Sequence, residues 1–207
     1  MTDYTFNDLI PVVENQLDSA RQCLARAFQD DPAPSYMIPD YEKRKALLPE
    51  LYYGVVHYAH QYDLIQTLAD TTHGVSLWMK PGSVNIPVHK MIKSGLLTAY
   101  LKVGISRLGR ALNYLNFAEA QRIKIVPDRH WYLFMIGVDP AYQNHGIGSR
   151  LLTPVLAQAD KEGLPVYLDT FNEKTLTFYR KHGFTIAEEA LIPNGGPRGW
   201  FLLRQPQ

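Results

Sequence analysis

The segment from Val138 to Leu152 constrains the fold of this chain more than any other. An apolar run, His130–Val138, leads into it, and apolar residues at helical spacing follow, so the segment connects a strand to a helix. The loop between them holds Gly146 and Gly148. Glycine lets the backbone approach a ligand closely, and a helix start offers unpaired N–H donors and a partial positive charge. Together these features are typical of a phosphate-binding site.

Several kinds of phosphate ligand use such a loop. A kinase-type P-loop ends in Gly-Lys-Ser/Thr, but here Gly148 is followed by Ser149 and Arg150. A dinucleotide fingerprint needs a third glycine where this chain has Leu151, although Asp169 stands about 20 residues further on, where a ribose-binding acid would sit. The plainest alternative is a turn that only starts the helix.

Two signatures in the chain resemble those of the GCN5-related N-acetyltransferase (GNAT) superfamily. The loop fits Gln/Arg-x-x-Gly-x-Gly/Ala, with residues Gln143-Asn144-His145-Gly146-Ile147-Gly148. Downstream, the family's Asn…Tyr…Gly-Phe segment is matched by Asn172, Thr175, Phe178, Tyr179, Gly183 and Phe184. Both occur in the family's order with a predicted strand between them. The resemblance implies an α+β GNAT fold, in which a mixed, mostly antiparallel central sheet is flanked by helices on both faces.

Further segments are similar to the puromycin N-acetyltransferase-like branch of that superfamily. They are Phe28-x-x-Asp31-Pro32, Trp78, His130–Leu133, Ile136–Val138, Pro154 and Tyr167–Thr170. The similarity is firm over residues 128–190, weaker over 20–82 and missing over 85–125. Asp169 departs from the branch, which tends to carry Glu at this position.

The resemblance implies acetyl-CoA as co-substrate and identifies the residues that would bind it. The pantetheine arm is expected to fill a gap beside the strand that ends at Val138, and the Val138 N–H to stabilise the oxyanion. The expected coenzyme-binding residues are Ile136, Gly137, Val138, Gln143, Asn144, His145, Gly146, Ile147, Gly148, Ser149, Asn172, Thr175 and Phe178.

Two residues are expected to be catalytic. Tyr179 matches the family's acid for the leaving thiolate, and a phenol with a reference pKa near 10 stays protonated at neutral pH. Asp169 is the expected base, acting directly or through water, with His130 and Glu119 as rivals. The alternative is structural for both: Tyr179 as a core aromatic residue and Asp169 as a hydrogen-bond acceptor.

Length and composition favour one domain over residues 1–207, with core motifs at 128–190 and a variable helical insertion at 85–125. This insertion and residues 32–38 are expected to shape the acceptor pocket. A net charge of +1 gives no reason to expect nucleic acid or a membrane as a partner. The single cysteine, Cys23, excludes an internal disulfide and fits a cytoplasmic protein. A homodimer is left open.

A metal site is not expected. His57 and His60 stand three residues apart on a predicted helix, close enough to share a metal, but no third ligand stands at suitable spacing.

The pattern of apolar residues predicts the elements and two local distortions. Helices are expected over 17–30, 40–60, 88–121 (broken near Gly104–Gly109), 146–161 and 172–182, and strands over 64–69, 74–80, 130–138, 165–170, 184–192 and 198–204. The segment 31–39 is expected to be a loop. Gly137 suggests a bulge or a close backbone approach, and Pro154 a kinked helix.

The predicted function is therefore acetyl transfer from acetyl-CoA to the amine of a small molecule, by direct transfer in a ternary complex. A protein or peptide amine is the first alternative acceptor. A non-catalytic acyl-CoA-binding sensor on the same fold is an alternative of a different class, and a Rossmann-type dehydrogenase is a more distant one.

Overall fold

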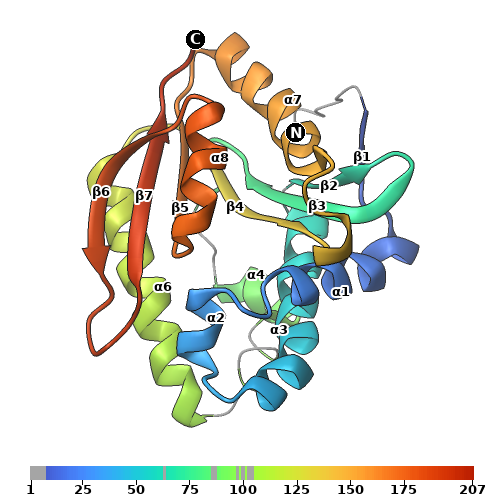
Figure 1. The fold of residues 1–207 in the computed structure, drawn as a ribbon, viewed down its shortest axis with the longest axis vertical. Helices are drawn as coiled ribbons and strands as arrows, with labels where there is room; N and C mark the ends of the chain where they lie inside the picture. Colours follow the sequence, from blue (N-terminus) through green and yellow to red (C-terminus); the bar gives the residue numbers. More distant parts are fainter. Residues whose placement is uncertain (1–7, 63, 85–87, 97, 99–100, 102–104) are drawn as a thin grey trace.

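Seven strands form one sheet in the computed structural model, which describes residues 8–62, 64–84, 88–96, 98, 101 and 105–207 (Figure 1). The strand order is β1-β2-β3-β4-β5-β7-β6. Every neighbouring pair is antiparallel except β4 and β5, which are parallel. The strands are β1 (Leu9–Pro11), β2 (Leu64–Leu68), β3 (Thr71–Met79), β4 (Trp131–Val138), β5 (Val166–Thr170), β6 (Thr185–Leu191) and β7 (Arg198–Arg204).

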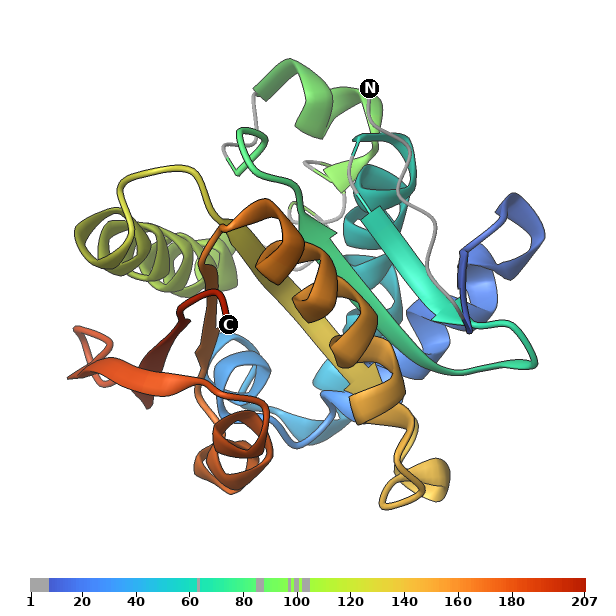
Figure 2. The ribbon, with the colours of Figure 1, turned by 90° about the horizontal axis from the view of Figure 1, so that it is seen from above.

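Helices cover both faces of this sheet, as expected for the α+β class. Figure 2 shows α1 and α3 on one face of β3 and β4, and α7 on the other. The helices are α1 (Leu17–Ala27), α2 (Pro32–Met37), α3 (Tyr41–Tyr62), α4 (Val88–Lys93), α6 (Ile105–Ile125), α7 (Ile147–Glu162) and α8 (Leu176–Lys181). Among the described residues, none of these helices combines the length and apolarity that a membrane span needs.

The core forms where each helix buries its apolar stripe against the sheet. In α7 the predicted stripe is confirmed: Leu152 and Val155 are fully buried against Trp131 of β4 and Val166 of β5, and Leu151 is fully buried in a neighbouring cluster with Leu9 and Leu68 of β1 and β2. On the other face, α1 and α3 bury Leu24 and Val56 against Val75 and Leu77 of β3. The core therefore fixes β3 and β4 from both sides.

Segment 31–39 contains a helix, so the expectation of a loop is wrong there. Asp31 caps α2: its Oδ1 accepts a hydrogen bond of 3.0 Å from the Ala33 N–H, and Pro32 occupies the first turn, where its missing N–H is not needed. The first helix, expected over 17–30, ends at Ala27, and the Asp-Pro pair starts the next helix. The short strand β1 was not expected either.

Other local expectations met mixed outcomes. The expected break near Gly104–Gly109 is wrong at Gly109, which lies inside α6, while Gly104 lies outside the described residues. Helix α7 runs from Ile147 to Glu162 with Pro154 in its interior.

Gly137 marks a close approach between β4 and α1: an added Cβ would lie 2.9 Å from Leu24 Cδ2 and 3.1 Å from the Ala27 Cβ of α1. The bulge lies earlier in β4, at Phe134, where the pairing with β3 shifts register.

Candidate active site

β4 and β5 separate after a short paired stretch. Trp131–Leu133 pair with Val166–Leu168, and the pairing stops there. Beyond it, Asp169 and Thr170 pair with β7 while β4 continues along β3 as far as Val138. The two parallel strands thus diverge at their carboxyl ends.

Backbone N–H groups of β4 face the space that opens. The Asp139 N–H donates to the His73 carbonyl, so it points toward β3. N–H groups alternate in direction along a strand, so the N–H groups of Gly137 and Met135 also point toward β3. The N–H groups of Ile136 and Val138 point away from β3, toward the gap. The gap therefore has a ladder of donors along one side.

The loop after β4 is held in place by its own side chains. Gln143 Nε2 donates to the Val138 carbonyl at 3.0 Å, and Asp139 Oδ2 accepts from Arg26 Nε of α1 at 2.7 Å. Asn144 and Gly146 both have left-handed backbone conformations, with φ of 65° and 78°. Gly146 is the N-cap of α7, so the free N–H groups of the helix start point out of a rigid loop.

A cavity of about 530 Å³ lies between this loop, the end of α1 and α8; we call it the loop cavity. It brings together all of the expected coenzyme-binding residues except His145, whose exposed ring bonds to the Gln143 carbonyl at 2.8 Å. Those that line it are Ile136, Gly137, Val138, Gln143, Asn144, Gly146, Ile147, Gly148, Ser149, Asn172, Thr175 and Phe178. Lys174 adds a positive charge to this lining.

A second cavity, of about 130 Å³, joins the loop cavity; we call it the Asp169 cavity. Five residues line both cavities: Phe28, Asp31, Ile136, Thr175 and Tyr179. Helix α2 contributes Pro34 and Met37 to the Asp169 cavity, and α6 contributes Tyr114 and Leu115. The segment 32–38 and part of the 85–125 segment therefore do wall a space next to the expected catalytic residues.

Tyr179 lies at the junction of the two cavities. Its ring packs edge-on against Phe178 and Phe184, with ring centroids 5.2 and 5.9 Å away. Burial raises the pKa of this phenol above its ordinary value, and the carboxyl groups of Asp31 and Asp169 raise it further. Tyr179 is thus a core aromatic residue and, at the same time, a protonated hydroxyl at a cavity junction.

Asp169 is half-buried near the end of β5 and has a specific hydrogen-bond donor. The Tyr132 hydroxyl donates to Asp169 Oδ1 at 2.7 Å. Burial raises the pKa of Asp169 to about 6, although this hydrogen bond opposes the shift. A carboxyl group with such a pKa can accept a proton near neutral pH.

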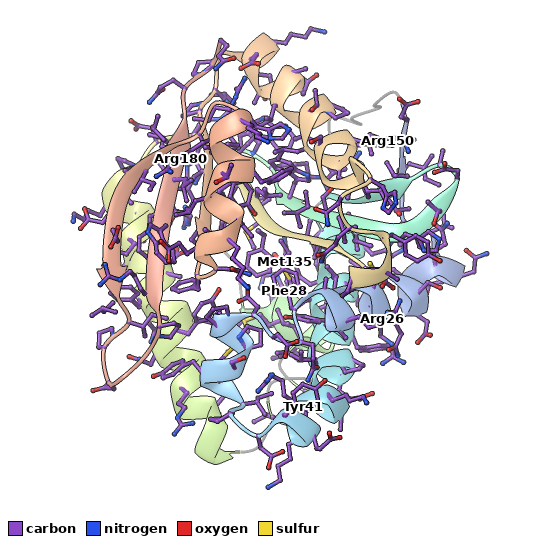
Figure 3. All side chains as sticks on the ribbon, viewed as in Figure 1. Arg26, Phe28, Tyr41, Met135, Arg150 and Arg180 are labelled. Carbon is purple, nitrogen blue, oxygen red and sulfur yellow. The ribbon has the colours of Figure 1, made fainter. Side chains whose placement is uncertain are left out.

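Asp31 and Phe28 were not predicted as site residues. Figure 3 labels Phe28, at the end of α1, and Met135 of β4 in the middle of the molecule, and both line the Asp169 cavity. Asp31 follows in the turn to α2, and burial raises its pKa to about 6 as well. The sequence signal was present in Phe28-x-x-Asp31-Pro32, which resembles the puromycin N-acetyltransferase-like branch, but no site role was assigned to these residues.

The rival bases have other surroundings. His130 is buried beside Arg122, with 3.2 Å between His130 Nε2 and Arg122 Nη1, and its Nδ1 bonds to the Asp128 carbonyl. Burial lowers the pKa of His130. Glu119 receives hydrogen bonds from Arg122. Neither residue lines the loop cavity or the Asp169 cavity.

No cluster of three or more potential metal ligands occurs in the part of the chain that the structure describes. The two histidines of α3 have partners of other kinds. The His57 ring packs on Tyr53, and His60 Nδ1 bonds to the Val12 carbonyl.

Known proteins are similar to this chain in sequence and in fold. Residues 108–184 match the acetyltransferase (GNAT) family. An uncharacterized N-acetyltransferase of Schizosaccharomyces pombe is 31% identical over 197 residues, which are 91% of this chain and 79% of that protein. The N-alpha-acetyltransferase RimI of Mycobacterium tuberculosis is 41% identical over 92 residues, or 44% of this chain and 46% of RimI.

The fold agrees with these matches. A crystal structure from Corynebacterium glutamicum, described as histone acetyltransferase HPA2 and related acetyltransferase, superposes with a TM-score of 0.64 at 18% identity and covers 98% of each chain. The chain therefore belongs to the acetyltransferase (GNAT) family and is an acyltransferase.

Proposed function

We propose that this enzyme transfers the acetyl group of acetyl-CoA to the amine of a small molecule by direct attack in a ternary complex. The observation that carries the proposal is the meeting of two cavities at Tyr179. The loop cavity leads from the glycine loop to Tyr179, and the Asp169 cavity continues from there. A thioester at the end of the coenzyme would therefore face an amine in the Asp169 cavity.

The loop cavity fits the coenzyme in two parts. The N–H groups at the start of α7, beyond Gly146, suit the pyrophosphate, and Lys174 supplies an opposite charge. The gap beside β4 suits the extended pantetheine arm, which can accept hydrogen bonds from Ile136 and Val138. Ile136 lines both the loop cavity and the Asp169 cavity, whereas Val138 lines the loop cavity and not the Asp169 cavity. We therefore assign the Ile136 N–H as the donor to the thioester oxygen. The Val138 N–H, predicted from sequence for that role, then holds the arm.

The reaction needs one proton acceptor for the amine and one hydrogen-bond donor for the departing sulfur. The amine nitrogen attacks the thioester carbon, the new C–N bond forms and the C–S bond breaks. Asp169 takes the amine proton directly or through a water molecule, and the Tyr179 hydroxyl hydrogen-bonds to the sulfur as negative charge develops on it. Because its pKa is raised, Tyr179 keeps its proton at neutral pH and stabilises the departing thiolate as a donor.

A covalent relay through cysteine does not fit the chain. Cys23 is the single cysteine, and it is fully buried in the core between α1 and α3. Burial raises the pKa of its thiol to about 11, so the nucleophilic thiolate is scarce at neutral pH. Direct transfer is therefore the route that the residues support.

Two similarities bear on the class of the acceptor. The resemblance to the puromycin N-acetyltransferase-like branch supports a small molecule, whereas the similarity to RimI supports a peptide N-terminus as a second candidate. A non-catalytic sensor would have no use for Asp169 and Tyr179 around one junction. A library of small amines and short peptides, screened by thiol release from acetyl-CoA, distinguishes a small-molecule acetyltransferase, a peptide acetyltransferase and a sensor. Coenzyme binding without any thiol release would identify the sensor.

The glycine loop should be required for coenzyme binding. Gly146→Glu places a carboxylate where the pyrophosphate should lie, so titration calorimetry should show acetyl-CoA affinity falling by at least about tenfold, or about 1.4 kcal/mol. Gly163→Glu is the matched control. Gly163 caps the other end of α7 with a similar φ of 64°, and an added Cβ meets nothing within 4 Å at either site. Equal affinity in the two folded variants would remove the loop from the coenzyme site.

The Tyr179 hydroxyl should act on the chemical step. Tyr179→Phe keeps the ring and its packing but removes the donor, so single-turnover acetyl transfer should slow by roughly 10²-fold or more. Coenzyme affinity should change little, because the hydroxyl matters mainly once the sulfur gains charge. A wild-type rate at neutral pH would contradict the assignment. A parallel loss of coenzyme binding would make Tyr179 a packing residue.

The pH dependence should identify the base. Asp169 must be ionised to accept a proton, and its pKa is raised to about 6. We divide kcat/KM of the wild-type enzyme by kcat/KM of Asp169→Asn at each pH, because this ratio cancels the titration of the acceptor. The ratio should rise about fivefold from pH 5 to 6 and less than about twofold from pH 6 to 7. Asp31→Asn is the control, since Asp31 has a similarly raised pKa. The assignment fails if removal of Asp31, and not of Asp169, abolishes the pH dependence.

A further inference from the structure

A third cavity, of about 370 Å³, adjoins the Asp169 cavity; we call it the α6 cavity. It lies between α3, α4 and α6 on one side and β3 and β4 on the other, and its walls include Tyr58, Trp78, Met91 and Ala118. Its volume falls in the range of about 300–1,000 Å³ that is typical of small-molecule sites. Neither coenzyme binding nor the acetyl transfer step uses this space.

The α6 cavity and the Asp169 cavity share part of their walls. Val55, Tyr114, Leu115 and Phe134 line both spaces. Tyr132 lines the α6 cavity, and its hydroxyl donates to Asp169, which lines the other. A molecule that extends from the α6 cavity would therefore meet the proposed base at its inner end.

The walls of the two spaces favour an apolar body with a single amine. Most of the side chains that line the α6 cavity are aliphatic or aromatic, so a polar chain placed there would lose hydrogen bonds to water without regaining them. Among the described residues that line the two spaces, none carries a basic side chain, while Asp31, Asp169 and Glu119 carry carboxyl groups. Glu119 is already engaged by Arg122. Such a lining accepts an amine and disfavours an anion.

We propose that the acceptor is a primary amine with one uncharged aliphatic or aromatic arm, and that the arm occupies the α6 cavity while the amine reaches Asp169. This inference rests on the proposed function, since it places the acceptor opposite the coenzyme. The α6 cavity should disfavour polyamines, amino sugars and peptide N-termini, because each of these acceptors would carry charged or strongly polar groups into the apolar space.

The first test compares acceptors with the wild-type enzyme. In a series of n-alkylamines from ethylamine to octylamine, kcat/KM should rise about threefold or more with each methylene until the cavity is full. Phenethylamine should exceed 1,4-diaminobutane, glucosamine and an alanyl peptide by at least about tenfold. An unchanged kcat/KM along the series would overturn the proposal, as would preference for the diamine, the sugar or the peptide.

The second test fills the cavity. Ala118→Phe adds a ring from α6 into the space, so the KM for octylamine should rise at least about tenfold while that for ethylamine changes less than about twofold. The matched control is Ala120→Phe, because Ala120 is exposed on the same helix and should change neither value. Equal effects of Ala118→Phe on short and long amines would overturn the proposal.

A third variant covers the case in which Ala118→Phe does not fold. Leu115→Ala enlarges the space, so the preferred alkyl chain should become longer; an unchanged optimum would overturn the proposal. Calorimetry with acetyl-CoA alone separates this inference from the proposed function. If coenzyme binds and none of the apolar amines is acetylated, the inference fails; if coenzyme does not bind, the proposed function fails with it.

Discussion

β4 and β5 remain hydrogen-bonded for only three residues each, and the site occupies the space beyond that point. β4 stays paired with β3 and β5 stays paired with β7, so the separation leaves N–H donors of β4 facing the gap. Asp169 lies on β5 beyond the point of separation. Gly137 allows α1 to pack tightly on β4, because any side chain there would collide with Leu24 and Ala27. That packing places Phe28, at the end of α1, and Asp31, in the following turn, beside the gap.

The same arrangement makes the site costly to fold. Burial raises the pKa of Asp31 and of Asp169 to about 6, from an ordinary value near 4. Both carboxyl groups therefore ionise less readily in the folded chain than in the unfolded one. Their contribution makes folding less favourable as pH rises from about 4 to about 6, and the full penalty persists above that range. Carboxyl groups with strongly raised pKa values in a cleft are typical of functional sites.

Sequence patterns predicted the part of the site that depends on local structure. The glycine loop and the stripe of α7 follow from spacing along one chain segment, and so does the position of Tyr179 in α8. The hydrogen bond from Tyr132 to Asp169 could not be found in this way, because 37 residues separate them. Phe28 and Asp31 reach the gap only through the packing of α1 on Gly137. The α6 cavity depends on α3, α4 and α6 together, and the sequence over 85–125 showed no resemblance to the branch that could indicate it.

Residue-resolved amide hydrogen exchange tests most directly whether the gap beside β4 holds the coenzyme. In the free protein, the Gly137 and Met135 amides should be protected by β3, whereas the Ile136 and Val138 amides should exchange faster because they face the gap. Saturating acetyl-CoA should slow exchange at Ile136 and Val138 by at least about tenfold and leave Gly137 and Met135 almost unchanged. Unchanged exchange at Ile136 and Val138 in the coenzyme-bound protein would contradict the account.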